Sequence, residues 1–152
     1  MLVKAILESK SREIVTAKPS MTFDEAMGTL IEKGISCLPV VDDNGDLKGI
    51  ISDRDIFRKI HETKGDYSSL TVGDVMKESL IVGVPEDDAS YITGLMSKNW
   101  IRHIPIVEDG KLVGLVSQRD IIVSQAEKKE IENRYLKAYL DDVSGPSRSG
   151  DL

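Results

Sequence analysis

The chain contains one segment twice. Residues 39–56 align with residues 105–121 once Asn44 is treated as an insertion, and ten of the seventeen aligned positions are identical. Each copy closes on nearly the same eight letters, GIISDRDI (49–56) and GLVSQRDI (114–121). This duplication restricts the fold to two similar units. One unit of about 60 residues buries too little surface to be stable alone, so the two units are expected to share a core.

Local signals predict the element order β-α-β-β-α in both copies. Thr22 and Glu25 have the spacing of a capping box, and Asp43-Asn44-Gly45 is typical of a hairpin turn. We expect an α/β (α+β) fold in which the repeats pack sheet to sheet about a pseudo-two-fold axis, with two related clefts. The predicted strands are 12–17, 37–41 and 47–52, then 80–84, 104–107 and 111–117; the predicted helices are 22–33 and 54–60, then 88–99 and 119–125, with short lead-in helices at 3–7 and 72–76.

The sequence divides into three parts. Residues 1–65 form repeat 1 and residues 66–125 form repeat 2, and the polar stretch 61–69 links them. Residues 126–152 form a C-terminal extension. Within it, 126–140 predict a helix with Ile131, Tyr135 and Tyr139 on one side, and 141–152 predict a frayed polar tail. For that helix, packing on its own chain or on a second subunit is favoured over an effector surface.

Composition limits the function. The 152 residues carry a net charge of −6, which argues against nucleic acid as a partner. The apolar runs are too short to span a bilayer, and Lys4, Glu8 and Lys10 interrupt the start of the chain, so we expect no signal peptide and no membrane partner. A single cysteine, Cys37, excludes an internal disulfide and a cysteine-based zinc site. It suits a reducing compartment, and we expect a cytoplasmic location.

The repeated Ser-x-x-Asp, at 52–55 and 117–120, fits two interpretations. As a capping box it would only start a helix. Its aspartate, however, is shorter than the usual Glu or Gln, and an arginine (Arg54 or Arg119) stands in the first helical turn, where the helix dipole disfavours a cation. An anion held over the helix N-terminus accounts for that arginine. Neutralisation of the arginine by neighbouring aspartates is the weaker alternative.

As a binding site, the motif provides the groups that a nucleotide needs. A serine hydroxyl and an arginine suit a phosphate. An ionised aspartate only accepts hydrogen bonds, so it suits the two hydroxyls of a ribose. The glycine three residues before the serine either lets a base approach the backbone or serves tight strand packing. The residues concerned are Gly49, Ser52, Arg54 and Asp55 in copy one, and Gly114, Ser117, Arg119 and Asp120 in copy two.

The segments PVVDDNGDLKGIISDRDI and PIVEDGKLVGLVSQRDI resemble those of tandem CBS (cystathionine-β-synthase) domains, and the resemblance covers both copies. It implies a regulatory module that binds AMP, ADP, ATP, S-adenosylmethionine or NAD in clefts between the copies. The aspartate would bind the ribose, and the serine would bind the ribose or a phosphate. Adenine contacts are implied from the early strand of each copy: Ile14, Val15 and Thr16 in copy one, and Leu80, Ile81 and Val82 in copy two.

The copies differ at positions where the family makes polar contacts. Thr16 matches a threonine common in the family, whereas copy two has Val82 there. Copy two instead has Arg102 and His103 where copy one has Ser and Cys. The resemblance implies that this basic pair reaches ligand phosphates; the alternative is a solvent-facing strand start. We therefore expect two inequivalent sites.

No pattern points to catalysis. The two histidines lie outside any triad-like arrangement, Cys37 fits a core strand, and the acidic residues lack metal-ligand spacing. We expect no enzyme activity and no metal. The alternative function is a dimerisation or docking module with degenerate ligand clefts. The resemblance also implies a homodimer, to which Met27, Ile31 and Trp100 contribute if they are not core residues, and a regulated protein that the sequence does not name.

Overall fold

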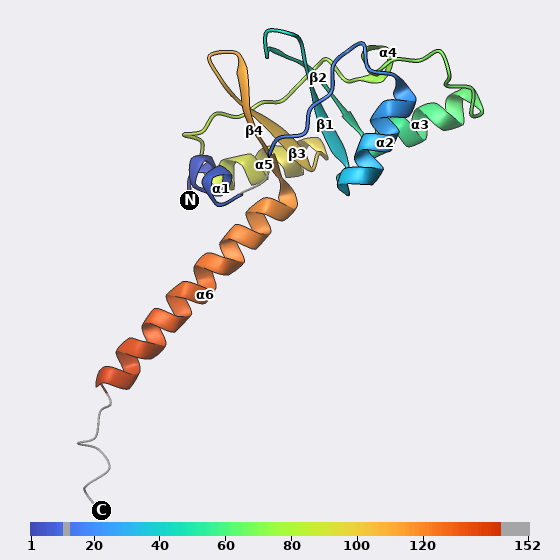
Figure 1. Cartoon of the computed structure of the whole chain (residues 1–152). Coiled ribbons are helices and arrows are strands. Elements are labelled where there is room, and N and C mark those ends of the chain that lie inside the picture. Colours follow the sequence, from blue (N-terminus) through green and yellow to red (C-terminus); the bar gives the residue numbers. More distant parts are fainter. Residues whose placement is uncertain (11–12, 144–152) are drawn as a thin grey trace, which may run out of the picture.

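The computed structural model describes residues 1–10 and 13–143 (Figure 1). The prediction of two small α/β units followed by a C-terminal helix is confirmed. Two antiparallel hairpins, β1–β2 and β3–β4, lie side by side, and the last helix projects away from them. In chain order the elements are α1 (Val3–Ser9), α2 (Phe23–Lys33), β1 (Cys37–Val41), β2 (Leu47–Ser52), α3 (Asp53–Thr63), α4 (Val72–Val75), α5 (Ala89–Asn99), β3 (His103–Glu108), β4 (Lys111–Ser117) and α6 (Gln118–Val143).

The register of each hairpin places the repeated motif beside the start of the partner strand. Ser52 ends β2 opposite Cys37, and Ser117 ends β4 opposite His103. Both hairpins turn through a glycine in the left-handed region, which other residues adopt only with strain. The helix that follows each hairpin therefore begins at the end of its second strand, beside the start of the first.

The early strands are shorter than predicted. Each makes one parallel bridge, Ala17 with Val40 in repeat 1 and Gly83 with Ile106 in repeat 2. Arg12, the first residue of the first predicted strand, lies outside the described residues. A parallel ladder that continued on either side of each bridge would need an N–H group at positions where the chain has proline, which has none. Those residues are Pro19 and Pro39 in repeat 1, and Pro85 and Pro105 in repeat 2.

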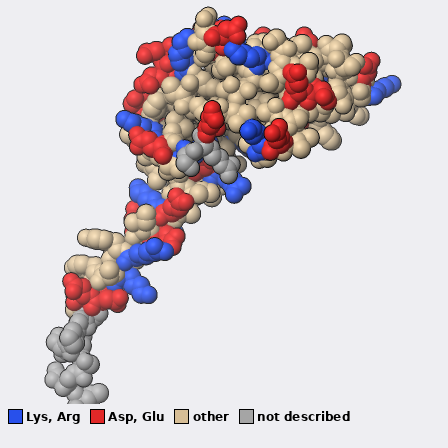
Figure 2. Space-filling model, in the orientation of Figure 1, with Lys and Arg blue, Asp and Glu red and all other residues tan. Residues whose placement is uncertain are grey.

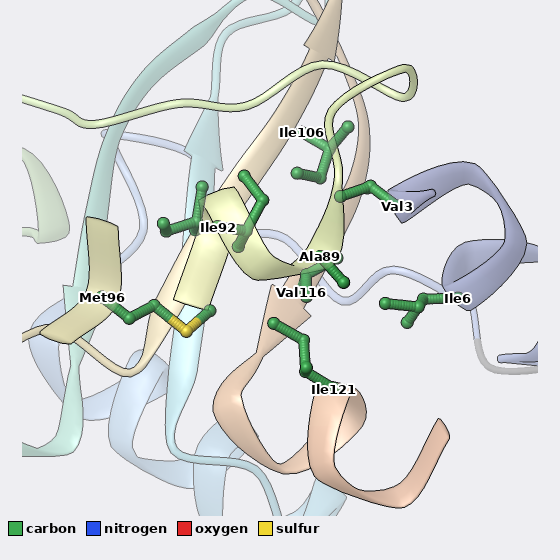
Figure 3. Packing of buried hydrophobic residues seen from close by; sticks show 9 residues of the cluster. Val3, Ile6, Ala89, Ile92, Met96, Ile106, Val116 and Ile121 are labelled. Carbon is green, nitrogen blue, oxygen red and sulfur yellow. The ribbon is translucent and has the colours of Figure 1, made fainter. Parts of the chain in front are cut away.

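Each lead-in helix packs into the core of the other repeat. From α1, Val3 and Ile6 are fully buried against α5, β3, β4 and α6 (Figure 3). From α4, Val72 is buried in the core of repeat 1. Burial of one such aliphatic side chain contributes about 1.5–3 kcal/mol, so neither core is complete without the other repeat's helix. An antiparallel bridge joins the start of each lead-in helix to the opposite repeat. Leu2 pairs with Asp88, and Thr71 pairs with Thr22.

The last helix is longer than predicted. The two helices expected over 119–125 and 126–140 form one continuous α6, and 141–143 belong to it instead of to the polar tail. The remainder of that predicted tail, 144–152, lies outside the described residues. Every residue from Gln125 to Val143 is exposed, so this part of α6 does not pack on the described part of its own chain.

The surface carries several large apolar side chains. Met27 packs against the core, whereas Ile31 and Trp100 are 82% and 89% exposed. On the face shown in Figure 2, acidic and basic side chains are intermingled over the body and along α6. No helix among the described residues is both long enough and apolar enough to cross a membrane.

Candidate functional site

Both Ser-x-x-Asp motifs form helix capping boxes. The backbone N–H of Asp55 donates to Ser52 Oγ at 3.3 Å, and that of Ser52 donates to Asp55 Oδ2 at 3.0 Å. In the second copy the matching distances are 3.0 Å, to Ser117 Oγ, and 2.8 Å, to Asp120 Oδ2. The argument that aspartate is too short to close the box was wrong. The capping residue Ser52 has extended backbone geometry (φ −115°, ψ 165°), and from there its N–H reaches the shorter carboxylate.

A lysine from a distant segment pairs with each motif aspartate. Lys10 Nζ, just beyond α1, donates to Asp120 Oδ2 at 2.7 Å and to the carbonyl oxygen of Leu115 at 2.8 Å. Lys77 Nζ, just beyond α4, lies 3.3 Å from Asp55 Oδ1. Burial alone would raise the pKa of Asp120, but the hydrogen bonds from the lysine and the helix cap outweigh burial and lower it. Asp120 is therefore an ionised acceptor at neutral pH.

The edge of β4 beside Asp120 differs from the corresponding edge of β2. In repeat 1 the backbone of Ile50 exchanges two hydrogen bonds with Lys77, of 3.0 and 2.9 Å. The equivalent residue in repeat 2, Leu115, lies opposite Pro105, so its N–H and C=O face the outer edge. There the side chain of Lys10 donates a hydrogen bond to the carbonyl oxygen of Leu115. The β4 edge thus presents its backbone groups to the space beside it.

A cleft of about 950 Å³ opens over this edge, between the two repeats. Its volume lies in the range of small-molecule sites, which also combine apolar walls with a few polar groups. Both repeats contribute apolar and polar side chains to its lining. Eight of the predicted site residues line it: Ile14, Val15, Arg102, His103, Gly114, Ser117, Arg119 and Asp120.

The basic residues of the cleft differ in charge and in partners. Arg102 Nη2 lies 3.7 Å from Asp53 Oδ1 of the other repeat. Arg119 is exposed in the first turn of α6 and makes no ion pair with any described residue. His103 is half-buried, with Nε2 3.3 Å from Ser36 Oγ. Burial, and next the charge of Arg102, lower the pKa of His103, so it offers a neutral imidazole at neutral pH. The arginines are the cations suited to an anionic ligand.

The other eight predicted site residues do not line this cleft. A Cβ at Gly49 would meet Met76 Sδ at 2.6 Å and the carbonyl oxygen of Lys77 at 2.8 Å, and one at Gly114 would meet Leu7 Cδ2 at 2.5 Å. Tight packing therefore explains why glycine stands at both positions. Each glycine makes room for the segment at the end of a lead-in helix. The eight residues away from the cleft are Thr16, Gly49, Ser52, Arg54, Asp55, Leu80, Ile81 and Val82.

The sequence interpretation missed several residues of the cleft. Lys10 and Ile35 come from repeat 1, and the first turns of α6 add Ile122, Val123 and Glu127. The available signal for Lys10 was a lysine shortly after each predicted lead-in helix, at 10 and at 77. That signal needed the knowledge that these helices cross to the opposite repeat.

The structure gives Cys37 a place in the core. Its side chain is buried at the start of β1, and burial, followed by the nearby Asp55 and Asp53, raises the pKa of the thiol to about 12. A thiol held protonated in this way is a poor nucleophile. Within residues 1–10 and 13–143, no cluster of three His, Cys, Asp or Glu side chains is arranged to hold a metal ion.

Two antiparallel hairpins with crossed lead-in helices and a cleft between the repeats define a duplicated α/β module, and sequence comparison identifies its family. The family profile of the CBS domain matches residues 3–62 and 72–127, one match in each repeat. The chain belongs to the CBS domain family. CBS domain-containing protein YhcV of Bacillus subtilis is 30% identical over 123 residues, which are 81% of this chain and 86% of YhcV. Several other curated relatives are longer, and the chain spans 22% to 60% of their length.

Two similar solved structures contain adenosine compounds. The CBS domain pair of protein MJ0100, in complex with 5′-methylthioadenosine and S-adenosyl-L-methionine, has a TM-score of 0.73 and 32% identity, over 84% of this chain and 98% of that one. CBSX2 in complex with AMP has a TM-score of 0.68 and 29% identity, over 78% of this chain and 92% of that one.

Proposed function

We propose that this chain is a regulatory module that binds an adenosine-containing ligand in the cleft between its repeats. The observation that carries the proposal is the composition of that cleft. It combines the ionised Asp120 and the arginine Arg119, both at the start of one helix, with apolar Ile14 and Val15 from the other repeat. Acceptor, cation and apolar wall are the three surfaces that ribose, phosphate and base require.

Each part of the ligand has a candidate partner. Asp120 accepts hydrogen bonds from the ribose hydroxyls, and Ser117 contacts the ribose or a phosphate. Arg119 and Arg102 attract the phosphates, which favours AMP, ADP or ATP; S-adenosylmethionine or NAD are the other candidates. Adenine packs against Ile14 and Val15. The AMP and S-adenosyl-L-methionine bound in similar structures support this ligand class.

The regulatory role rests on linkage. A ligand that binds one arrangement of the repeats more tightly shifts the chain toward that arrangement, and a partner protein then responds to the shift. We propose a homodimer in the cytoplasm, acting on a protein still to be identified, with no catalytic step and no nucleic acid or membrane partner. The position around Ser52 and Asp55 in the other copy is inequivalent to this site, because it does not line the cleft and the backbone of Lys77 occupies the edge of β2 beside it.

A thermal-shift experiment tests the ligand class. AMP, ADP, ATP, S-adenosylmethionine and NAD, each at a hundred times its Kd, should stabilise the fold by about 2.7 kcal/mol if bound only by the native state. Asp120→Asn should abolish the shift, while Asp55→Asn, which changes an equally capped and lysine-paired aspartate away from the cleft, should keep it. No shift with any of the five compounds would overturn the proposal. A shift lost only in Asp55→Asn would move the ligand to the other repeat.

A second candidate function is a docking module with unused clefts. The observation that favours it is the ion pair of Lys10 with Asp120, because that carboxylate already has a cationic partner. Under this alternative all five compounds leave the melting temperature unchanged. An assay for phosphate released from ATP separates either function from catalysis.

A further inference from the structure

The outer part of α6 is exposed on all sides in the described structure. Figure 1 shows α6 leaving the body of the protein, and every residue from Gln125 to Val143 is exposed. Most helix stability in proteins comes from the packing of an amphipathic face, so we expect a helix whose apolar side chains are exposed to have a partner. Large apolar side chains mark where that partner packs. They are Ile131 (67% exposed), Tyr135 (76%), Leu136 (57%), Tyr139 (60%) and Val143 (62%), and together they form what we call the α6 stripe.

The stripe occupies one side of the helix. Ile131, Tyr135, Tyr139 and Val143 recur every fourth residue, which is the spacing of a packing ridge, and Leu136 lies beside Tyr139 at i, i+3. The opposite side is charged. Arg134 Nη2 donates to Glu130 Oε1 at 2.7 Å, an i, i+4 ion pair typical of a solvated surface. The helix is therefore amphipathic along a length over which every residue is exposed in the described part of the chain.

The α6 stripe is a property of this chain and not of the CBS fold. The family match ends at residue 127, before the first residue of the stripe. Similar solved structures cover 78% and 84% of the chain, so they leave part of it without a counterpart. A contact built on the stripe is consequently additional to any contact between the bodies of two CBS pairs.

The charges at the two ends of the α6 stripe favour one direction for pairing with a second copy of this helix. Two lysines, Lys128 and Lys129, precede the stripe, and two aspartates, Asp141 and Asp142, lie at its far end. A second α6 in parallel would place lysines beside lysines and aspartates beside aspartates. An antiparallel α6 that crosses at Tyr135 places each pair of lysines opposite the partner's aspartates. Opposite charges attract and like charges repel, so the antiparallel arrangement is favoured.

We infer that the outer half of α6 binds the same segment of a second copy of this chain, antiparallel, with the two helices crossing at Tyr135. In that arrangement Ile131 of one copy packs against Tyr139 of the other, and the solvated ion pair of Arg134 and Glu130 stays outside. This inference does not depend on the ligand proposed for the cleft.

Engineered cysteines in the full chain test the direction of pairing. Cys37 is the single native cysteine and is buried, so it does not compete for oxidation. Tyr135→Cys should form a disulfide dimer with itself, and Ile131→Cys should cross-link with Tyr139→Cys in a mixture but not with itself. Self-cross-linking of Ile131→Cys would show a parallel pair and overturn the inference. So would the absence of any disulfide dimer.

Sedimentation velocity tests whether the stripe causes association. Leu136→Glu should weaken dimerisation at least tenfold, while Lys137→Glu, a matched change on the charged side of the same helix, should leave it within twofold. Circular dichroism and thermal melting confirm that both variants fold. If Leu136→Glu associates as the natural chain does, the contact lies elsewhere on the protein. A monomeric natural chain at high concentration overturns the inference as well.

Discussion

The ammonium of Lys10 and the carboxylate of Asp120 lie 2.7 Å apart although 110 residues separate them in the sequence. The contact joins the end of α1, which begins the chain, to the start of α6, and it forms part of the wall of the cleft. Both side chains are largely shielded, at 29% and 19% exposure. In the complex that we propose, a ribose bound by Asp120 shares this carboxylate with the lysine. Under that proposal the pair connects the stability of the fold with occupancy of the cleft.

Lys10→Met should lower the free energy of unfolding at pH 7 by about 1 kcal/mol, which corresponds to roughly 3 °C in melting temperature for a chain of this length. Methionine keeps the apolar stem and removes the charge, so the loss reports on the ion pair. Urea unfolding measures it. Lys4→Met, an exposed change in the preceding helix α1, is the control and should be neutral.

The sign of the pH dependence follows from the lowered pKa of Asp120. Asp120 stabilises the fold fully at a pH above its pKa in the unfolded chain, which is about 3.9. This stabilisation is lost as the pH falls through its lower pKa in the folded chain. The difference in the free energy of unfolding between the natural chain and Lys10→Met should therefore become smaller in acid. A difference that stays constant from pH 7 down to acid unfolding would assign the effect to packing.

Glycine substitutions should separate the two lead-in contacts. Gly49→Ala places a methyl group 2.8 Å from the carbonyl oxygen of Lys77, which is backbone and cannot move aside, so we expect a loss of about 2 kcal/mol. Gly114→Ala meets only the flexible end of Leu7 and should cost about 1 kcal/mol. Gly28→Ala, inside α2 with nothing within 4 Å, should stabilise the chain by roughly 0.8 kcal/mol.

Urea unfolding of these three alanine variants measures the change in the free energy of unfolding for each of them. Equal losses at Gly49 and Gly114 would mean that the segment after α4 yields as easily as a side chain. Retention of ligand binding in Gly114→Ala would also show that a base does not need the backbone at this position.

Local patterns predicted most of the elements. The capping box at Thr22, the turn at Gly45 and the apolar periodicity each depend on neighbours within a few residues, and the structure has all three. The short early strands could also have been predicted from the sequence, because Pro39 has no N–H to pair with a third strand. The crossed packing of Val3 was not, since nothing in a local pattern tells a lead-in helix which of two similar cores it enters.

The candidate site was predicted in the same uneven way. Ser117 and Asp120 follow from a motif, and the motif was right about the helix start whether or not a ligand binds there. Lys10 and the wall formed by α6 were missed because they reach the cleft through tertiary structure. The mistaken argument about short aspartates came from treating the capping box as a fixed side-chain length, whereas the backbone of the capping residue adjusts.

His103 should make the fold less stable in mild acid. Burial and Arg102 lower its pKa, while Asp120 and Asp53 raise it and Lys10 lowers it further, with a net decrease. A histidine whose folded pKa lies below the unfolded value of about 6.5 takes up protons on unfolding, so stability falls as the pH drops from 7 toward 5. His103→Gln should lose this part of the pH dependence in urea unfolding.

His61, exposed near the end of α3, supplies a control substitution, His61→Gln, for the change of side chain itself. With two histidines in the sequence, proton NMR of the imidazole rings can follow each titration separately. A ring of His103 that titrates at or above 6.5 would contradict the prediction.

Ligand and α6 pairing should be linked, because both act on one helix. The cleft is lined by Arg119, Ile122 and Glu127 in the first turns of α6, and the α6 stripe lies further along the same helix. A ligand that orders these turns removes part of the entropy cost of pairing, so AMP should strengthen dimerisation. Coupling free energies of this kind are typically 1–3 kcal/mol, so we expect a change of roughly fivefold or more.

Reciprocity makes this prediction strict. If saturating AMP tightens the dimer by some factor in sedimentation equilibrium, dimerisation must tighten AMP binding by the same factor. Calorimetric titration of AMP into the natural chain and into the Leu136→Glu variant, whose α6 pairing is weakened, measures the second factor, and Lys137→Glu controls for the added charge. Equal AMP affinity in all three chains, with AMP bound, would show that the cleft and the α6 stripe act independently, and the signal would then have to leave the cleft through the body of the CBS pair.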